Sequence, residues 1–301
     1  MQGSEMQGSD MQGSDMTVQQ AQRALSSAFK TAGIDTAPLD ARVLLEAVTG
    51  LDATDMARLP ERLLTAQERA LLLDYQTQRL RAKPVSKILG QREFWGRAFE
   101  VNEHVLDPRP DSETLIEAAL QHLPEAQAFR LLDLGTGSGC LLLTLLAERA
   151  HGEGLGVDVS GAALAVAQAN AQRLGVSAQA QFLESHWFEA VTPSFDMIIS
   201  NPPYISDAQM RQLDKNVLEY DPRLALHGGE DGLDPYRHIS AQAQSYLRPE
   251  GWLLFEIGHT QGEEVCAMMR QSGFEEISVL PDLGARDRVV MARAPRGPRR
   301  K

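Results

Sequence analysis

The sequence predicts an α/β protein with a doubly wound sheet, preceded by a small helical domain. From residue 129 onward, short apolar runs typical of strands alternate with helical runs, and this alternation favours a parallel sheet with helices on both faces. A glycine-rich turn follows the first run and an acidic residue ends the second, at the strand ends where such sheets bind ligands. Before residue 84 the apolar residues recur only at helical spacing.

The chain is expected to have five parts, of which two carry a core. The first part repeats a Met-Gln-Gly-Ser-acid unit three times, and such a polar segment buries too little apolar surface to fold. We interpret it as a cloning tag or an in-frame extension, with Met16 as the natural start. The expected parts are a disordered repeat over residues 1–15, a helical domain over 16–85, a connector over 86–107, an α/β domain over 108–295 and a basic tail over 296–301.

Composition narrows the class of protein. With 301 residues, 43% of them hydrophobic, the chain can bury a sizeable core, and no apolar run reaches the roughly 20 residues that span a bilayer. Two cysteines cannot form a disulfide framework, so we expect a cytoplasmic protein with reduced thiols. The net charge of −12 argues against direct binding to nucleic acid. The seven histidines show no spacing typical of a metal site, so none is expected.

The spacing of the apolar residues along the chain predicts the positions of the helices and strands. In the helical domain, segments 18–29 and 39–48 have helical spacing, and a capping box of Thr65 with Glu68 opens the apolar run 71–80. Strands are expected over 129–134, 154–159, 180–183, 195–200, 252–257, 277–280 and 289–292, and further helices over 114–122, 161–174 and 262–272.

Two loops have competing interpretations. Asp111, Ser112 and Glu113 precede the helix at 114–122, and we expect Asp111 or Ser112 to cap it, because Asp and Ser side chains accept hydrogen bonds from the first N–H groups. Acidic residues also suit the positive end of a helix. The stretch 228–232 contains three glycines and is expected to be a flexible loop, either a lid over a ligand or a plain surface loop.

A glycine loop and an acid together favour a nucleoside ligand. Residues 133–139, Asp-Leu-Gly-Thr-Gly-Ser-Gly, end the first strand, and glycine there lets a ligand approach the backbone closely. Neither Gly135 nor Gly137 begins a G-x-G-x-x-G run, and no Gly-Lys-Ser/Thr follows, so two common phosphate-binding loops are excluded. Asp158 ends the second strand, where an acid can accept hydrogen bonds from both hydroxyls of a ribose or cap the helix that starts near Ser160.

Three stretches in this order resemble class I S-adenosylmethionine-dependent methyltransferases: LLDLGTGSG (131–139), GVDVS (156–160) and FDMIISNPPYI (195–205). The resemblance implies a seven-stranded Rossmann-like sheet with one antiparallel strand, supplied by the hairpin of the last two strands. His186 stands where relatives often carry Asp, so no acidic contact to the adenine amine is implied. The implied cofactor residues are Gly135, Thr136, Gly137, Ser138 and Gly139 under the methionine part, Asp158 at the ribose, Trp187 near the adenine, and Asn201.

Asn201-Pro202-Pro203-Tyr204, at the end of the fourth strand, suits methyl transfer to a planar amine. An amide nitrogen is a poor nucleophile, and two acceptors aimed at its N–H groups would orient it and stabilise the positive charge that develops. We expect the Asn201 side-chain carbonyl and the Pro202 backbone carbonyl to be these acceptors, on a turn that both prolines stiffen, with Tyr204 as a flat face. Asparagine is no general base, so the proton is expected to leave to solvent. The alternative is a rigid turn with a packed tyrosine.

The net charge and a closer resemblance reduce the number of molecules that could accept the methyl group. Adenine in DNA, guanine in RNA and a glutamine side chain all present a planar NH₂ group, and the acidic chain favours a protein over a nucleic acid. The stretches EFWG (93–96), PRPDSETL (108–115), HGGEDGLDPYRHI (227–239) and LLFEIGHTQGEEV (253–265) resemble peptide chain release factor glutamine N5-methyltransferases.

This closer resemblance covers most of residues 17–293. It implies methylation of the glutamine in the Gly-Gly-Gln motif of bacterial class 1 release factors, with a helical N-terminal domain that helps to grip the substrate protein. Asp107 and Ser112 replace a more usual aliphatic residue and Thr, and neither is expected to change the chemistry. Three alternatives stay open: a ribosomal-protein glutamine methyltransferase, a nucleic-acid amine methyltransferase and a non-enzymatic binding module.

Overall fold

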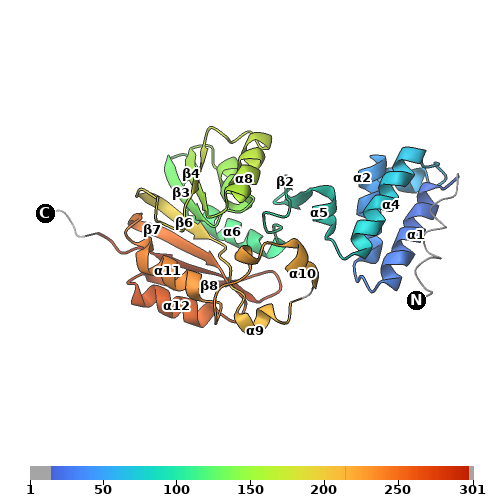
Figure 1. Cartoon of the computed structure of the whole chain (residues 1–301). Helices are drawn as coiled ribbons and strands as arrows, with labels where there is room; N and C mark the ends of the chain where they lie inside the picture. The colour runs from blue at the N-terminus through green and yellow to red at the C-terminus, as the bar shows by residue number, and fades with distance from the viewer. Residues whose placement is uncertain (1–14, 214, 298–301) are drawn as a thin grey trace. The chain divides into compact units, whose positions relative to one another are not determined.

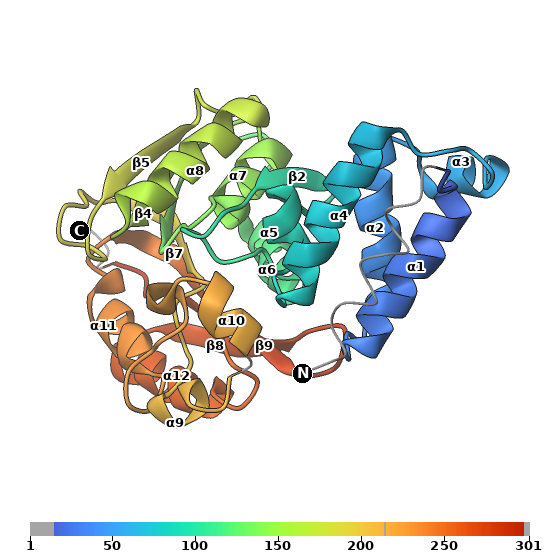
Figure 2. The same cartoon turned by 45° about the vertical axis from the view of Figure 1, so that its right-hand side comes forward.

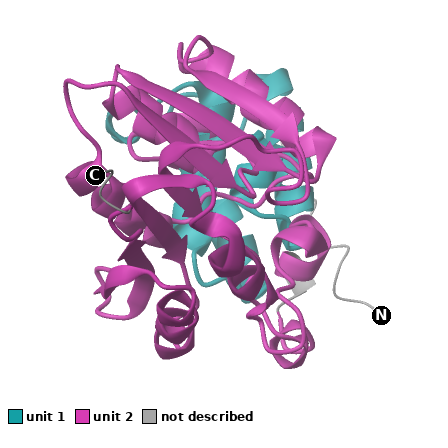
Figure 3. Cartoon of the chain, turned by 90° about the vertical axis from the view of Figure 1, so that its left-hand side faces the viewer, with its two compact units in different colours: residues 1–90 teal, residues 91–301 magenta. Residues whose placement is uncertain are grey.

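The computed structural model describes residues 15–213 and 215–297 of the chain. It divides into two compact units, residues 1–90 and 91–301, which Figure 3 colours teal and magenta. Apart from Asp15, the expected N-terminal repeat lies outside the described residues, and so does the end of the expected basic tail.

The first unit consists of helices, and the sequence predicted the three long ones. The segments expected at 18–29, 39–48 and 71–80 are confirmed as parts of α1, α2 and α4 (Figure 2). Thr17 and Thr65 each make a capping box, at the starts of α1 and α4. Helices α3 and α5 were not predicted, because so short a segment gives little periodicity. The helices are α1 (Val18–Thr31), α2 (Ala37–Thr49), α3 (Ala53–Arg58), α4 (Ala66–Leu80) and α5 (Val85–Leu89).

The second unit contains the predicted seven-stranded sheet. Its strands lie in the order β5-β4-β3-β6-β7-β9-β8 (Figure 1). Only the pairs that involve β9 are antiparallel, so the last hairpin supplies the one antiparallel strand. The strand order reverses at β3, which places a ligand crevice at its carboxyl end. The strands are β3 (Phe129–Leu134), β4 (Gly152–Asp158), β5 (Ala180–Glu184), β6 (Phe195–Ser200), β7 (Leu247–Glu256), β8 (Glu275–Pro281) and β9 (Asp287–Arg293).

Helices cover both faces of this sheet (Figures 1 and 2). Successive residues of a strand point to opposite faces, and they belong to two separate cores. Leu131 and Met197 are buried in the core that includes α6 and α7, whereas Leu132 and Ile198 are buried with α11 and α12. The helices are α6 (Glu113–His122), α7 (Cys140–Glu148), α8 (Gly161–Arg173), α11 (Asp234–Ala243) and α12 (Gly262–Gln271).

A short β-hairpin lies inside the range 86–107, where only a connector was expected. It turns at Trp95 and Gly96, both with positive φ, and its Phe99 is fully buried in the core of the second unit. Strands of four residues give too little alternation for the sequence to reveal them. The hairpin strands are β1 (Gln91–Phe94) and β2 (Arg97–Glu100).

Four short elements lie in the connections before α6 and between β6 and α11. A 3-10 turn, η1, leads into α6, and the connection from β6 to α11 contains two short helices and a second 3-10 turn. Among the described helices, none is both long enough and apolar enough to cross a bilayer. These short elements are η1 (Pro110–Ser112), α9 (Asp207–Met210), α10 (Lys215–Tyr220) and η2 (Arg223–Ala225).

Candidate active site

The glycine-rich loop after β3 folds back against the end of β4. The N–H groups of Gly135 and Thr136 donate to the carbonyl oxygen of Val157 at 2.8 and 2.9 Å. Gly135, Gly137 and Gly139 have φ values of +73°, +54° and +78°, a conformation that residues with a side chain rarely adopt. A Cβ atom on Gly137 would meet nothing within 4 Å, so the loop leaves open space beside its own backbone.

Asp158, the last residue of β4, ties this loop to the next helix. Its carboxylate accepts hydrogen bonds from the N–H of Gly137 and from the N–H of Ser160, both at 2.9 Å. Ser160 is itself the cap of α8, because its hydroxyl accepts from the N–H of Ala163. The interpretation of Asp158 as the helix cap is therefore wrong. Burial raises the pKa of Asp158, and its hydrogen bonds with backbone N–H groups act in the opposite direction.

Two buried side chains support the loop from within the protein. The hydroxyl of Thr136 donates to Asp133 at 2.7 Å, and the amide of Asn170 donates to the carbonyl oxygen of Ser138 at 2.9 Å. Burial raises the pKa of Asp133 to about 7, and the nearby charge of Asp158 adds to the rise. These contacts fix the shape of the loop.

Three rings gather beyond the carboxyl end of β5. Trp187 lies beside the glycine loop, since a Cβ atom on Gly135 would be 3.8 Å from its Cζ3. The ring centroid of His186 is 5.9 Å from that of Trp187 and 5.6 Å from that of His238 on α11. Nδ1 of His186 is 3.2 Å from the Glu189 carboxylate. The sequence predicted Trp187, whereas His238 comes from a distant helix and was missed.

The glycine loop, Asp158 and the three rings line one cavity of about 580 Å³. Because β3, β4 and β5 are neighbours in the sheet, their carboxyl ends present the glycine loop, the acid and the rings side by side. Gly139 was predicted to face a ligand but is not among the described residues that line the cavity; its added Cβ would meet Leu143 at 2.9 Å. The predicted residues that do line it are Gly135, Thr136, Gly137, Ser138, Asp158, Trp187, Asn201 and Pro203.

Asn201 follows the last residue of β6, next to the end of β3. The hydroxyl of Ser200 donates to the carbonyl oxygen of Leu134 at 2.7 Å, which joins the two strand ends immediately before the glycine loop. Asn201 is half-buried, and its Nδ2 is 3.5 Å from Oγ of Ser112. The strand pairing thus brings Asn201 to the cavity, as its place at a strand end predicted.

Asn201 stands where two cavities meet. A second cavity of about 460 Å³ is lined by Asn201 together with Tyr204 and Glu256. Burial raises the pKa of Tyr204, and the nearby charge of Glu256 adds to the rise. Pro203 lines the first cavity, whereas Pro202 is buried and is not among the described residues that line either one. The acceptor role expected of the Pro202 carbonyl therefore stays a prediction.

The stretch 228–232 packs directly on the backbone after Asn201. A Cβ atom on Gly228 would lie 2.6 Å from the carbonyl oxygen of Pro203, and one on Gly232 would overlap the carbonyl oxygen of Tyr204. Glycine is needed at both positions because two backbone segments approach so closely. Whether the stretch also acts as a lid stays a prediction.

Asp111 and Ser112 do not cap α6 with their side chains, contrary to the prediction. Ser112 occupies the cap position without a side-chain hydrogen bond to the helix, and Asp111 forms an ion pair with Arg288 of β9 at 3.0 Å. Glu113 lies in the first turn, as expected, and accepts a hydrogen bond from the N–H of Trp95 at 3.0 Å. Partners that are distant in the sequence replace the local caps.

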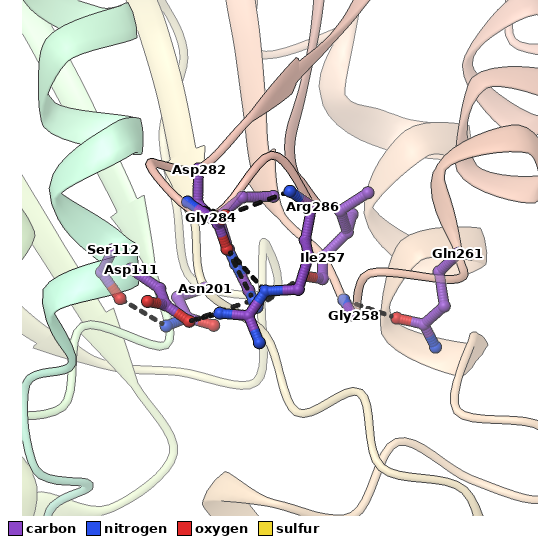
Figure 4. Close-up of polar contacts among 10 residues, drawn as sticks. Asp111, Ser112, Asn201, Ile257, Gly258, Gln261, Asp282, Gly284 and Arg286 are labelled. Atoms are coloured by element: carbon purple, nitrogen blue, oxygen red, sulfur yellow. Dashed lines mark hydrogen bonds and ion pairs between the residues drawn. The ribbon is translucent and has the colours of Figure 1, made fainter.

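A network of polar contacts surrounds this side of the site (Figure 4). The buried guanidinium of Arg288 pairs with Asp111 and Asp282, at 3.0 and 3.3 Å, and donates to the carbonyl oxygen of Ile257 at 3.2 Å. Glu256, the residue before Ile257, is 2% exposed. Sequence reasoning missed both Arg288 and Glu256. The only signal was the type of residue: a lone acid inside an apolar strand-like run, and a basic residue at the start of the last strand.

Metal and thiol chemistry have little support among the described residues. In that part of the chain no three His, Cys, Asp or Glu side chains group as they would around a metal ion. Cys140 and Cys266 are free, and burial raises the pKa of the Cys140 thiol to about 12, whereas a nucleophilic cysteine needs a low pKa.

Comparison with known proteins gives close matches over nearly the whole chain. Residues 111–230 match the family model of the methyltransferase small domain, and residues 20–90 match that of the PrmC N-terminal domain. A release factor glutamine methyltransferase from Caulobacter vibrioides is 42% identical, covering 91% of this chain and 96% of the relative. Another of the same name, from Cereibacter sphaeroides, is 46% identical, covering 91% and 98%. A solved methyltransferase structure from Pyrococcus furiosus is similar in fold, with a TM-score of 0.51 at 16% identity, covering 74% of this chain and 98% of that one.

Proposed function

Because this chain belongs to the release factor glutamine methyltransferase family, we propose that it transfers a methyl group from S-adenosylmethionine to the side-chain nitrogen of a glutamine. The acceptor proposed is the glutamine of the Gly-Gly-Gln motif in class 1 peptide chain release factors. The observation that carries the proposal is the position of Asn201, which lines both the larger cavity and the smaller one. A donor in the larger cavity and an acceptor in the smaller one would meet at this residue.

The residues around the larger cavity fit a nucleoside cofactor. Open space beside Gly137 would admit the cofactor against the loop, and the Asp158 carboxylate would accept hydrogen bonds from the ribose hydroxyls. Trp187 would pack against the adenine. Nδ1 of His186 is 3.2 Å from the Glu189 carboxylate. A neutral His186 that donates through Nδ1 would offer Nε2 as an acceptor for the adenine amine, at the position where relatives often carry Asp. S-adenosylmethionine supplies a methyl group bound to a positively charged sulfur.

Asn201 and Tyr204, which line the smaller cavity, and the two prolines between them fit a planar amide. The Asn201 Oδ1 would accept one N–H of the glutamine amide, and the Pro202 carbonyl oxygen would accept the other. These two acceptors orient the nitrogen and stabilise the positive charge that forms on it. Both prolines hold φ near −65°, and Tyr204 offers its ring to the amide plane. Because Asn201 cannot act as a base, the proton leaves to water after transfer.

Label transfer to a set of acceptors tests the proposal. The protein is incubated with S-adenosylmethionine labelled in the methyl group and with one acceptor at a time: a purified class 1 release factor, ribosomal proteins, duplex DNA or ribosomal RNA. We expect label in the release factor and none in the nucleic acids, in line with the net charge of −12. Label in DNA or RNA with an inert release factor would overturn the proposed acceptor. Cofactor binding without transfer to any acceptor would overturn the proposed reaction.

Gly228 gives a prediction about the turn that presents Asn201. We expect Gly228→Ala to lower kcat by about tenfold or more, because the new Cβ must displace the Pro203 carbonyl and a shift of about 1 Å misplaces a reacting group. Gly262→Ala is a matched control, since its Cβ would lie 2.9 Å from the flexible carboxylate of Asp287 and not from backbone. Steady-state kinetics on both variants, with melting temperatures measured alongside, check this. Equal kcat values for the two would contradict it.

A further inference from the structure

Glu256 is a buried acid at the site that the proposed mechanism leaves unused. It ends β7, and the parallel register pairs Ser200 with Phe255, so the next residues, Asn201 and Glu256, lie at neighbouring strand ends. Both line the smaller cavity. Hydrogen bonding by the Ser112 and Asn201 side chains lowers the pKa of the Glu256 carboxyl group, while Oε2 of Glu256 has no hydrogen-bond partner among the described residues.

We propose that Glu256 is a positioning residue, whose carboxylate accepts a hydrogen bond from Nδ2 of Asn201 and thereby turns Oδ1 of Asn201 toward the acceptor amide. An asparagine amide can rotate to exchange its oxygen and its nitrogen. Ser112 Oγ accepts from Nδ2 at 3.5 Å, and an ionised carboxylate can only accept, so Glu256 favours the orientation that turns the nitrogen of Asn201 toward it. The inference rests on the proposed function, which gives Oδ1 of Asn201 its task.

Groups from several elements hold this arrangement in place. Arg288 donates to the carbonyl oxygen of Ile257, next to Glu256, and its ion pair with Asp111 fixes the residue before Ser112. The positive charge of Arg288 also favours the ionised form of Glu256. The charged and titratable groups that neighbour Glu256 or line the same cavity are Arg109 and Asp111 before α6, Cys140 on α7, Tyr204 after β6, Tyr236 on α11, His259 after β7 and Arg288 on β9.

This arrangement makes turnover depend on pH. Burial raises the pKa of Glu256 to about 7, more than its hydrogen bonds and Arg288 lower it. Above that pH the carboxylate accepts from Nδ2 of Asn201. Below it the protonated carboxyl carries an O–H, which donates to Oδ1 of Asn201 and withdraws that oxygen from the acceptor amide. The kcat is therefore lost as the pH falls through the pKa of Glu256.

Glu256→Gln tests the proposal by fixing the protonated pattern of donors at every pH. We expect kcat to fall about 10- to 100-fold, because a misplaced group at the reacting centre costs about that much. The decrease in kcat that the wild type shows at low pH should disappear. The dissociation constant of the cofactor should stay unchanged. The variant should fold, because a neutral amide is easier to bury than a carboxylate. Glu250→Gln, the same change at a half-buried acid of β7 six residues earlier, should keep the wild-type kcat and pH profile.

A second measurement needs no acceptor and so separates this inference from the proposed function. In ¹⁵N-labelled protein, the side-chain amide signal of Asn201 is identified by its absence from the Asn201→Ala spectrum. We expect this signal to shift with pH, with a midpoint close to the pKa of Glu256, and to stay fixed in Glu256→Gln. The positioning role would be overturned if the Asn201 signal of the wild type does not shift with pH. It would also be overturned if Glu256→Gln keeps the wild-type kcat and the wild-type decrease in kcat at low pH. Failure of label transfer alone would count against the proposed function and not against the contact between Glu256 and Asn201.

Discussion

Replacing Asn201 with alanine is expected to lower kcat by roughly 10²- to 10³-fold, the usual cost of losing one hydrogen-bond partner to charge that forms in the transition state. The side chain lines both cavities, and its carbonyl is the proposed acceptor for the glutamine N–H. The cofactor should bind nearly as before, with a dissociation constant within about threefold, because the interaction is made mainly in the transition state. Steady-state kinetics and calorimetry measure the two quantities.

A second variant at this position separates chemistry from folding. Asn201→Asp keeps an oxygen acceptor and similar volume but places a negative charge beside Glu256, so we expect an intermediate kcat that declines further at high pH. Near-normal turnover in Asn201→Ala would remove this residue from the mechanism. A fall in melting temperature matching the loss of activity would assign it a structural role.

Replacing Asp158 with alanine is expected to weaken cofactor binding by about 10²-fold or more, since hydrogen bonds to a charged group contribute roughly 1.5–3 kcal/mol each. The substitution removes the proposed acceptor for the ribose hydroxyls. It also removes the contacts that hold the N–H groups of Gly137 and Ser160, so the glycine loop itself loses support. With saturating cofactor, kcat should recover most of its wild-type value, because Asp158 lies away from the reacting nitrogen.

Calorimetric titration with S-adenosylhomocysteine checks this effect. Glu153→Ala is the matched control, because Glu153 is an exposed acid at the opposite end of the same strand, and its dissociation constant should not change. Asp158→Asn should bind with intermediate affinity, since the amide keeps one acceptor oxygen. An Asp158→Ala protein with wild-type affinity would contradict the assigned ribose contact.

The sequence predicted the sheet and its cofactor edge because both depend on local patterns. A strand such as 195–200 is a short apolar run, and the glycine loop and Asp158 follow their strands directly. Parallel strands place their carboxyl ends at one edge, so these residues and Asn201 meet without knowledge of distant contacts. Trp187 was placed near the adenine by the resemblance to methyltransferases, and it lines the same cavity.

The other half of the site depends on contacts between residues far apart in the sequence. Arg288 reaches Asp111 from the last strand, and this ion pair takes Asp111 away from the helix cap that the local sequence favours. Glu256 became informative only when the register of β6 and β7 placed it beside Asn201. Neither residue has a period or a motif that states its partner, so spacing could not reveal them.

The most direct test of the central claim is to map the methyl group transferred to a class 1 release factor. After the label-transfer reaction, the release factor is digested and its peptides are sequenced by mass spectrometry. The account predicts one added methyl group on the side-chain nitrogen of the glutamine in the Gly-Gly-Gln motif, with none when the Asn201→Ala protein is used at the same concentration and time. A methyl group on another residue, or equal methylation by the Asn201→Ala protein, would contradict it.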